Sequence, residues 1–207
     1  MGAKPVLVLA SASPARKALL HAAGIDAEII VSGVDESAVD ATAPDTLCGV
    51  LARLKAHAVA ERLRHREPAR GSVLVLGCDS VLAFDGQILG KPDSAEDAVK
   101  RWHAMRGRSG VLHTGHCLVD LESGDTAERV GSTTVYFAEL SDEEIDAYVG
   151  SGEPLWVAGA FTIDGLGGPF VEGIEGDHSN VIGLSLPLLR HLLGDLGWSI
   201  TDLWRAR

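Results

Sequence analysis

The feature that most constrains the fold is a continuous apolar run from Val73 to Cys78, which ends at Asp79. The run shows no alternation of apolar and polar residues, which is typical of a strand buried on both faces. After Ser80 the chain returns to apolar residues at Val81, so the Asp79 carboxylate stands inside an otherwise buried stretch. In open α/β sheets, groups beyond the carboxyl ends of strands line the ligand crevice. Asp79 is therefore a candidate to hold a divalent cation or to take a proton from water, and a turn-forming aspartate is the alternative.

The N-terminal segment has the order strand, tight turn and helix. Residues 6–10 are apolar, Ser13 and Pro14 are typical of an N-cap and a first helical residue, and Gly24 ends the helix predicted over 15–23. The unpaired N–H groups at such a helix start attract an anion, and Ser11 and Arg16 would add donors. The alternative is that Ser13 only caps the helix and that Arg16 lies in solvent. A signal peptide is rejected because the apolar core is only five residues long.

The rest of the chain predicts strands and helices around one sheet. A strand is expected over 27–31, a hairpin over 81–89 around Asp85-Gly86, and a helix over 46–66 with a buried stripe of Leu47, Leu51, Leu54 and Ala58. Further expected elements are a helix to about residue 105 that Ser94 caps, a helix over 187–196, strands over 109–121 and 126–139, and a helix that opens on a Ser141–Glu144 capping box. Residues 150–180 are rich in glycine and predict loops with one or two short strands. The pattern indicates an α/β fold with a mixed twisted sheet and flanking helices. We expect a single domain over 1–207, with two lobes around a central cleft.

The composition is that of an acidic globular protein. The 207 residues are 46% hydrophobic and 23% charged, which excludes a disordered chain. No apolar stretch approaches the roughly 20 residues that a membrane-spanning helix needs, so no membrane partner is expected. The formal net charge of −11 argues against an extended nucleic-acid interface. Three cysteines without CxxC spacing indicate buried thiols in a reducing compartment, so we expect a cytoplasmic protein.

Two lysines and one glutamate add to the candidate site. Lys55 lies about 80° from Leu47 on a helical wheel, at the edge of the predicted stripe, where it can reach into a cleft or lie along the core. Lys91 stands between Gly90 and Pro92, which present its side chain on a stiff segment. Glu36 lies in an acidic loop that suits a cation or a polar ligand group, but equally solvent.

Other metal sites are not favoured by the sequence. Zinc at His113, His116, Cys117 and His178 is disfavoured because a strand places His113 and His116 on opposite faces. The acidic residues among the glycines of 165–180 lack the spacing of a calcium loop, so turns are expected there.

Six motifs, in this order and spacing, resemble those of the Maf family. They are Leu9-Ala10-Ser11-Ala12-Ser13-Pro14-Ala15-Arg16, Val34-Asp35-Glu36, Lys55-Ala56, Cys78-Asp79-Ser80, Ile88-Leu89-Gly90-Lys91-Pro92, and Gly173-Ile174-Glu175-Gly176-Asp177 followed by Asn180. The match extends over nearly the whole chain. The resemblance implies a two-lobed α/β fold related to the inosine triphosphate pyrophosphatases and a pyrophosphatase activity on nucleoside triphosphates. It also implies a divalent metal cation, Mg²⁺ or Mn²⁺, as cofactor, a cytoplasmic location and a homodimer.

The resemblance assigns roles by position. It implies that Asp79 is the catalytic base and, with Glu36, a metal ligand, and that the substrate and its phosphates are bound by Ser11, Arg16, Glu36, Lys55 and Lys91. Three positions depart from the family pattern and bear on base specificity. Ala15 stands where members commonly have arginine, and Ser80 stands where pyrimidine-type members have threonine and methylguanine-type members have glutamine. Asp164 aligns with a glutamine of the pyrimidine type, whereas the methylguanine type is acidic there, so the preferred base stays open.

The expected reaction is hydrolysis of a nucleoside triphosphate, standard or modified, between its α and β phosphates. A water that the metal or Asp79 activates would attack, giving monophosphate and pyrophosphate as a form of nucleotide-pool housekeeping. The alternative is a non-catalytic regulator of septum formation and cell division, or a DNA-associated factor. The net charge speaks against a DNA interface, and no stable nucleic-acid complex is expected.

Overall fold

The structure is a computed structural model that describes residues 4–39, 41, 43–65 and 72–205. Its centre is a seven-stranded mixed sheet in the order β2-β1-β3-β5-β6-β7, with β4 paired to β3. The strands are β1 (Val6–Leu9), β2 (Ala27–Ile29), β3 (Val73–Phe84), β4 (Gln87–Leu89), β5 (Ser109–Asp120), β6 (Thr126–Phe137) and β7 (Val171–Glu175). β1 is parallel to β2 and β3, and the other pairs are antiparallel.

Helices flank the sheet on both faces, which confirms the predicted fold class. They are α1 (Pro14–Ala22), α2 (Pro44–Arg64), α3 (Ala95–Met105), α4 (Asp142–Gly150), α5 (His178–Ile182) and α6 (Leu186–Asp195). Short 3₁₀ helices lie at Glu36–Ala38, Glu153–Trp156, Ala158–Ala160, Gly168–Phe170 and Ile200–Leu203. The predicted N-caps Ser13 and Ser94 and the Ser141–Glu144 capping box are confirmed.

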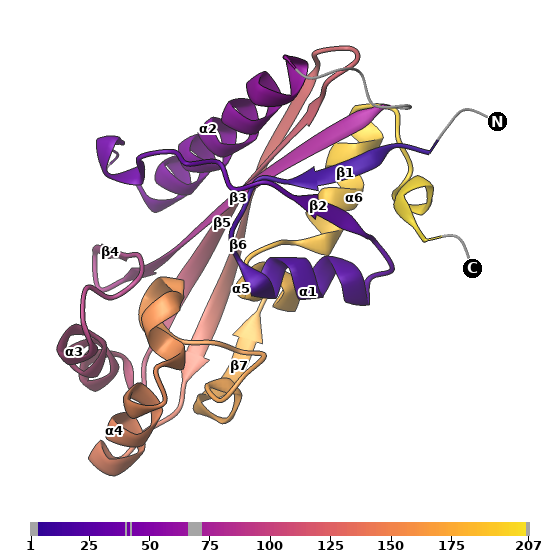
Figure 1. The fold of residues 1–207 in the computed structure, drawn as a ribbon. Helices are drawn as coiled ribbons and strands as arrows, with labels where there is room; N and C mark the ends of the chain where they lie inside the picture. The colour runs from indigo at the N-terminus through magenta and orange to yellow at the C-terminus, as the bar shows by residue number, and fades with distance from the viewer. Residues whose placement is uncertain (1–3, 40, 42, 66–71, 206–207) are drawn as a thin grey trace.

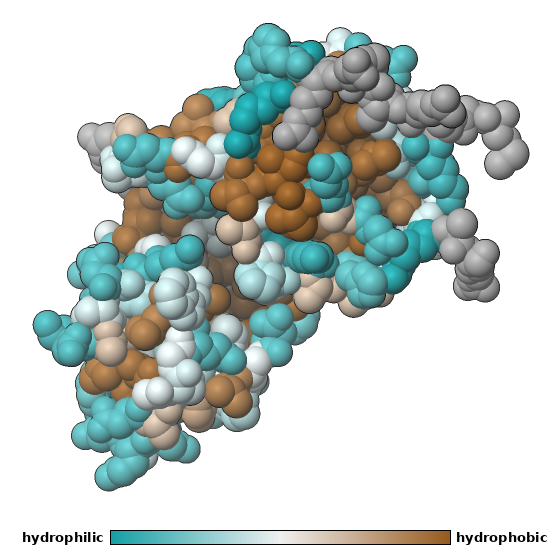
Figure 2. All heavy atoms as spheres, in the orientation of Figure 1, coloured by the Kyte–Doolittle hydropathy of each residue, from teal (hydrophilic) through white to brown (hydrophobic). Residues whose placement is uncertain are grey.

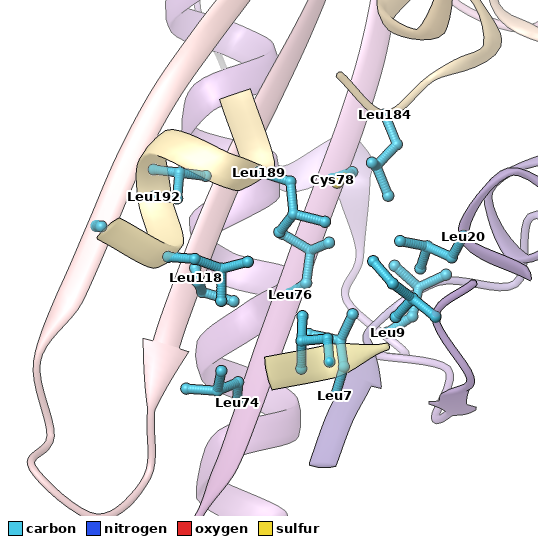
Figure 3. Packing of buried hydrophobic residues seen from close by; sticks show 14 residues of the cluster. Leu7, Leu9, Leu20, Leu74, Leu76, Cys78, Leu118, Leu184, Leu189 and Leu192 are labelled. Carbon is cyan, nitrogen blue, oxygen red and sulfur yellow. The ribbon is translucent and has the colours of Figure 1, made fainter. Parts of the chain in front are cut away.

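The buried apolar side chains form three clusters, two of which lie at one end of the long strands, on opposite faces of the sheet. At one end, alternate residues of β1 face opposite ways: Leu7 and Leu9 pack with α1 and α6 (Figure 3), and Val8 packs with α2. At the other end, Trp102 of α3 packs with Tyr148 of α4 and with the far halves of β3, β5 and β6. Figure 1 shows these ends as two lobes joined by β3, β5 and β6, and Figure 2 shows the surface indented between them.

Strand β3 is longer than the sequence predicts. It runs without a break from Val73 through Asp79 to Phe84, and it pairs with β5 from Leu74 to Ala83. The prediction that a strand ends at Asp79 is therefore wrong, because a charged residue interrupts the apolar pattern without interrupting the backbone ladder. The predicted hairpin around Asp85-Gly86 is confirmed, since β4 folds back on the end of β3.

Helix α2 buries a different stripe from the predicted one. The buried residues are Cys48, Leu51, Ala52, Lys55, Ala56, Val59 and Ala60, whereas Leu54 is 39% exposed. Of the four expected positions only Leu51 is fully buried, so the predicted stripe is wrong. Lys55 lies within the buried face rather than at its edge.

Small residues form that face because α2 and the sheet approach closely. A Cβ atom at Gly77 of β3 would collide with the Ala52 carbonyl oxygen and lie 2.7 Å from the Ala56 nitrogen. A Cβ atom at Gly115 of β5 would collide with the Cys48 carbonyl. The two glycines therefore set the distance at which α2 holds Lys55 over β3.

The described helices include none that is both long enough and apolar enough to cross a membrane.

Candidate active site

The candidate site lies where β1 ends. β1 pairs with β3 only from Val73 to Leu76, and among the described strands none pairs with Gly77–Ser80 on that side. From β1 the chain passes through α1 to β2 on one side, and then through α2 to β3 on the other. α1 and α2 cover opposite faces (Figure 1). This is the topological switch point, the place at which open α/β sheets bind ligands.

Arg16, in the first turn of α1, lies in this gap. Its Nε donates to the Gly183 carbonyl at 2.6 Å, and its Nη1 donates to Ser11 Oγ at 3.1 Å and to the Cys78 carbonyl at 3.0 Å. Its Nη2 donates to Ser80 Oγ at 3.0 Å. The alternative that Arg16 lies in solvent is wrong, since the residue is only 9% exposed. A guanidinium has five N–H groups, so these bonds leave one N–H of Nη2 for a ligand.

Ser80 links Arg16 to β5 and α5. Its Oγ lies 2.9 Å from Thr114 Oγ1, and Thr114 Oγ1 donates to the Asn180 carbonyl at 3.0 Å. That bond uses the single hydroxyl hydrogen of Thr114, so the Ser80 hydroxyl donates to Thr114 and accepts from Arg16. Ser80 is therefore a positioning residue for the guanidinium.

Asp79, Lys55 and Glu36 meet on the α2 side of β3. Asp79 Oδ1 accepts a hydrogen bond from Lys55 Nζ at 2.5 Å, and Glu36 Oε1 lies 2.6 Å from the same ammonium. Asp79 and Lys55 are 7% and 8% exposed, whereas Glu36 is exposed. Among the described residues, hydrogen bonds reach only Oδ1 of Asp79, so Oδ2 remains able to take a proton.

Burial is the main electrostatic influence on these groups. It raises the pKa of Asp79 above its ordinary value, although the Lys55 ammonium opposes the shift. A carboxylate with a raised pKa is a stronger base for water. Burial also raises the pKa of the Cys48, Cys78 and Cys117 thiols, to about 12, 11 and 12. These thiols are buried, as expected, and remain protonated at neutral pH.

The carboxylates of Asp79 and Glu36 suit a hard divalent cation. Both oxygens contact one ammonium, so a cation in its place would meet the same two donors. Mg²⁺ prefers oxygen ligands and is usually held by one or two carboxylates together with substrate phosphates. This donor set therefore fits the cofactor that the sequence led us to expect.

Three other predicted residues make no hydrogen bond or ion pair with this group among the described residues. Lys91 is exposed, and its carbonyl accepts from Arg101 Nη2 at 3.4 Å. Asp164 is exposed in the glycine-rich loop, and Ala15 is half-buried beside Arg16 on α1. Their roles stay predictions.

Sequence reasoning missed Thr114 and Gly183, and it considered His116 only as a zinc ligand. Thr114 and Gly183 contribute only through contacts with residues distant in the sequence, and no local pattern marks them. The pKa of His116 is lowered to about 4, mainly by burial and also by Arg16, so the ring is neutral. Its Nε2 accepts from the Ser185 backbone N–H at 2.8 Å, next to the start of α6.

Comparison with known proteins gives a consistent result. Residues 6–196 match the model of a family described as Maf-like protein. A protein of Salinispora tropica is 65% identical over 96% of this chain and 87% of its own length. A protein of Streptomyces coelicolor is 59% identical over 96% and 94%, and one of Nostoc punctiforme is 51% identical over 97% and 98%. All three are named nucleoside triphosphate pyrophosphatase. The fold and the switch-point site agree with this match, which covers nearly the whole chain. The chain belongs to the Maf family.

Proposed function

We propose that this chain hydrolyses a nucleoside triphosphate between its α and β phosphates and releases a nucleoside monophosphate and pyrophosphate. The observation that carries the proposal is a buried carboxylate of raised pKa, Asp79, which contacts the buried Lys55 ammonium at the switch point of the sheet, where the buried Arg16 guanidinium contacts the neighbouring Cys78 carbonyl. The names of relatives that are 65% and 59% identical support the same reaction.

Each residue has a role in this reaction. Asp79 takes a proton from the attacking water at Oδ2, while the water oxygen bonds to the α phosphorus and the bond from that phosphorus to the departing pyrophosphate breaks. Lys55 and the remaining N–H of Arg16 hold the phosphate charge, and Ser11 adds a hydroxyl near the start of α1. Lys91 would reach the charged tail from outside the buried group.

The proposal includes Mg²⁺ or Mn²⁺, held by Asp79 and Glu36 together with the substrate phosphates. When bound, the cation supplies charge neutralisation on the phosphates. Lys55, which now contacts both carboxylates, would then turn toward the phosphates. Removal of divalent cations by chelation should abolish turnover, and added Mg²⁺ or Mn²⁺ should restore it.

The reaction is tested by a product assay. Purified chain with Mg²⁺ or Mn²⁺ is offered dTTP, UTP, CTP, GTP, 7-methyl-GTP and ITP, and pyrophosphate and orthophosphate are measured separately. We expect pyrophosphate from at least one of them. Orthophosphate as the first product would indicate a phosphatase, and no release at all beside a working control enzyme would refute the proposal.

The proposal extends to the setting of the enzyme. We infer nucleotide-pool housekeeping by a cytoplasmic homodimer, with no stable nucleic-acid complex and no membrane partner. Light scattering on the purified protein tests the dimer. The alternative, a non-catalytic regulator of septum formation and cell division or a DNA-associated factor, has no need of a buried base, and the net charge of −11 opposes DNA binding.

Base preference belongs to the same proposal. An acid at position 164 can accept hydrogen bonds from a guanine-like edge, whereas glutamine both donates and accepts and so suits uracil or thymine. We expect Asp164→Gln to shift the ratio of guanine-type to pyrimidine-type turnover toward pyrimidines. With both substrates below saturation, a ratio that does not move would show that Asp164 does not contact the base.

A further inference from the structure

A second group of metal-ligating side chains lies on the α2 face of the sheet, outside the candidate active site. The ligand atoms of His57, Cys117 and Glu128 all lie within 4.8 Å of one another. Within the described ranges, no other set of three histidine, cysteine or acidic side chains comes together so closely. We propose that these three residues form a second cation site, which binds a thiophilic divalent ion of the zinc class.

The backbone places these ligands side by side. Cys117 on β5 and Glu128 on β6 are directly paired in the antiparallel register, so their side chains lie on the same face. Cys117 Sγ and Glu128 Oε1 are 3.8 Å apart. A tetrahedral zinc ion with bonds of about 2.3 Å to sulfur and about 2.0 Å to oxygen needs these two atoms roughly 3.5 Å apart. A shift of a few tenths of an ångström would therefore bring both atoms into coordination distance.

The surroundings orient the ligands and leave a path for the ion. Arg53 Nη1 lies 3.6 Å from Glu128 Oε2, so the salt bridge engages one carboxylate oxygen while the other faces Cys117. Cys117 is fully buried, whereas His57 and Glu128 are exposed, so an ion can enter from solvent. Three protein ligands leave a fourth position of a tetrahedral ion for water.

The donor atoms separate this site from the one that Asp79 and Glu36 would form. Sulfur and imidazole nitrogen select zinc-class ions, whereas a pair of carboxylates selects Mg²⁺ or Mn²⁺.

Cobalt titration of the full chain tests the site. The protein is freed of metal with a chelator and kept in excess Mg²⁺, so that carboxylate sites are filled. CoCl₂ should then give the near-ultraviolet charge-transfer band of a cobalt–thiolate bond with about one equivalent, and ZnCl₂ should remove it.

Single variants assign the band to this site. Cys117→Ser should abolish it, and His57→Gln and Glu128→Gln should each weaken cobalt binding at least about tenfold. Cys48→Ser is the matched thiol control, because a serine can keep the hydrogen bond that Cys48 donates to the Asp45 carbonyl, and it should leave the band unchanged. His65→Gln is the control for an exposed histidine, since His65 is the C-cap residue of α2.

The proposal is overturned if the wild-type chain gives no thiolate band, or if the band survives Cys117→Ser. It is also overturned if His57→Gln and Glu128→Gln bind cobalt like the wild type. These two variants change exposed side chains, so they decide the question even if Cys117→Ser does not fold.

Discussion

Asp79 can act as a base because Lys55 holds only one of its two carboxylate oxygens. The other oxygen is left to take a proton. Lys55 binds one of its two oxygens and also contacts Glu36, so the lysine would keep a carboxylate partner if Asp79 lost its charge. This arrangement separates the proposed catalytic role of Asp79 from its structural role and makes a conservative substitution informative.

We expect Asp79→Asn to lower turnover by about two or more orders of magnitude, as loss of a general base typically does, while the fold is retained. Initial rates of pyrophosphate release and circular dichroism measure the two effects. Asp85→Asn is the matched control, because Asp85 lies in the turn after the same strand and pairs with the exposed Arg108. Unchanged turnover in Asp79→Asn would remove Asp79 from the mechanism.

Individual site residues could be predicted from the sequence where the local pattern is unusual. Asp79 stood out as a charge in an apolar run, and Arg16 as a cation at a helix start. The burial of Lys55 could not be predicted, because the α2 face that contacts the sheet includes small residues such as Ala52 and Ala56, whereas the prediction followed the leucines. Thr114 and Gly183 join the site only through tertiary contacts, which single-sequence patterns do not contain.

At the scale of elements, the contact between α2 and the sheet determines where Lys55 lies. A methyl group at Gly77 has no space beside Ala52 and Ala56, so α2 must move away from β3. We expect Gly77→Ala to cost about 1–3 kcal/mol in the free energy of unfolding and to lower turnover, since Lys55 moves with the helix.

Urea unfolding and rate measurements on the same preparations check this prediction. The control is Gly194→Ala in α6, where a Cβ atom meets nothing within 4 Å and alanine favours a helix. If Gly77→Ala is as stable and as active as Gly194→Ala, the close approach of α2 does not matter for the site.

The glycine-rich segment after α4 depends on one carboxylate. Glu153 accepts hydrogen bonds from Thr162 Oγ1 at 2.5 Å and from the backbone N–H groups of Leu166 and Gly167 at 3.0 Å each. Partial burial acts to raise the pKa of Glu153, but these hydrogen bonds outweigh it and lower the pKa. Because the folded-state pKa lies below the unfolded one, the ionised carboxylate stabilises the fold above about pH 4.3, and this contribution is lost as pH falls through the folded-state pKa.

We therefore expect Glu153→Gln to lower the free energy of unfolding by about 1–2 kcal/mol at pH 7, with a smaller difference from wild type below pH 4. Urea unfolding at both pH values measures this change in the free energy of unfolding, and Glu172→Gln, at an exposed position, is the control. An equal loss of unfolding free energy at both pH values would mean that the charge of Glu153 does not stabilise this loop.

The elements themselves were largely predictable, because caps and turns act locally. The serine caps and the Asp85-Gly86 hairpin lie where predicted. The continuity of β3 through Asp79 was not predictable, since it follows from ten pairs of residues with β5, a strand far along the chain. Tertiary pairing here overrode the local break in the apolar pattern.

At the scale of the whole molecule, charge acts in two opposite ways on a triphosphate. The net charge of −11 repels it at long range, whereas Arg16 and Lys55 attract it inside the site. Salt screens exposed charges beyond about 10 Å at 0.1 M but screens buried ones much less.

We expect kcat/KM to rise as ionic strength increases from about 0.01 to 0.1 M. Initial rates at fixed free Mg²⁺ measure it, with NaCl and KCl compared to detect ion-specific effects. A fall in kcat/KM over this range would show that attraction by the site outweighs the repulsion by the net charge even at long range.

The wide spacing of the partners of Arg16 also has a consequence for folding. The guanidinium contacts residues 62, 64 and 167 positions away in the sequence. Contacts between residues so far apart in the sequence cost much loop-closure entropy and form late. No fragment of the chain therefore contains all the partners of Arg16. In a refolding experiment, secondary structure should therefore return before enzymatic activity, and activity should report the slowest phase. A chain still emerging from the ribosome would accordingly be unable to hydrolyse nucleotides until its last helices had docked.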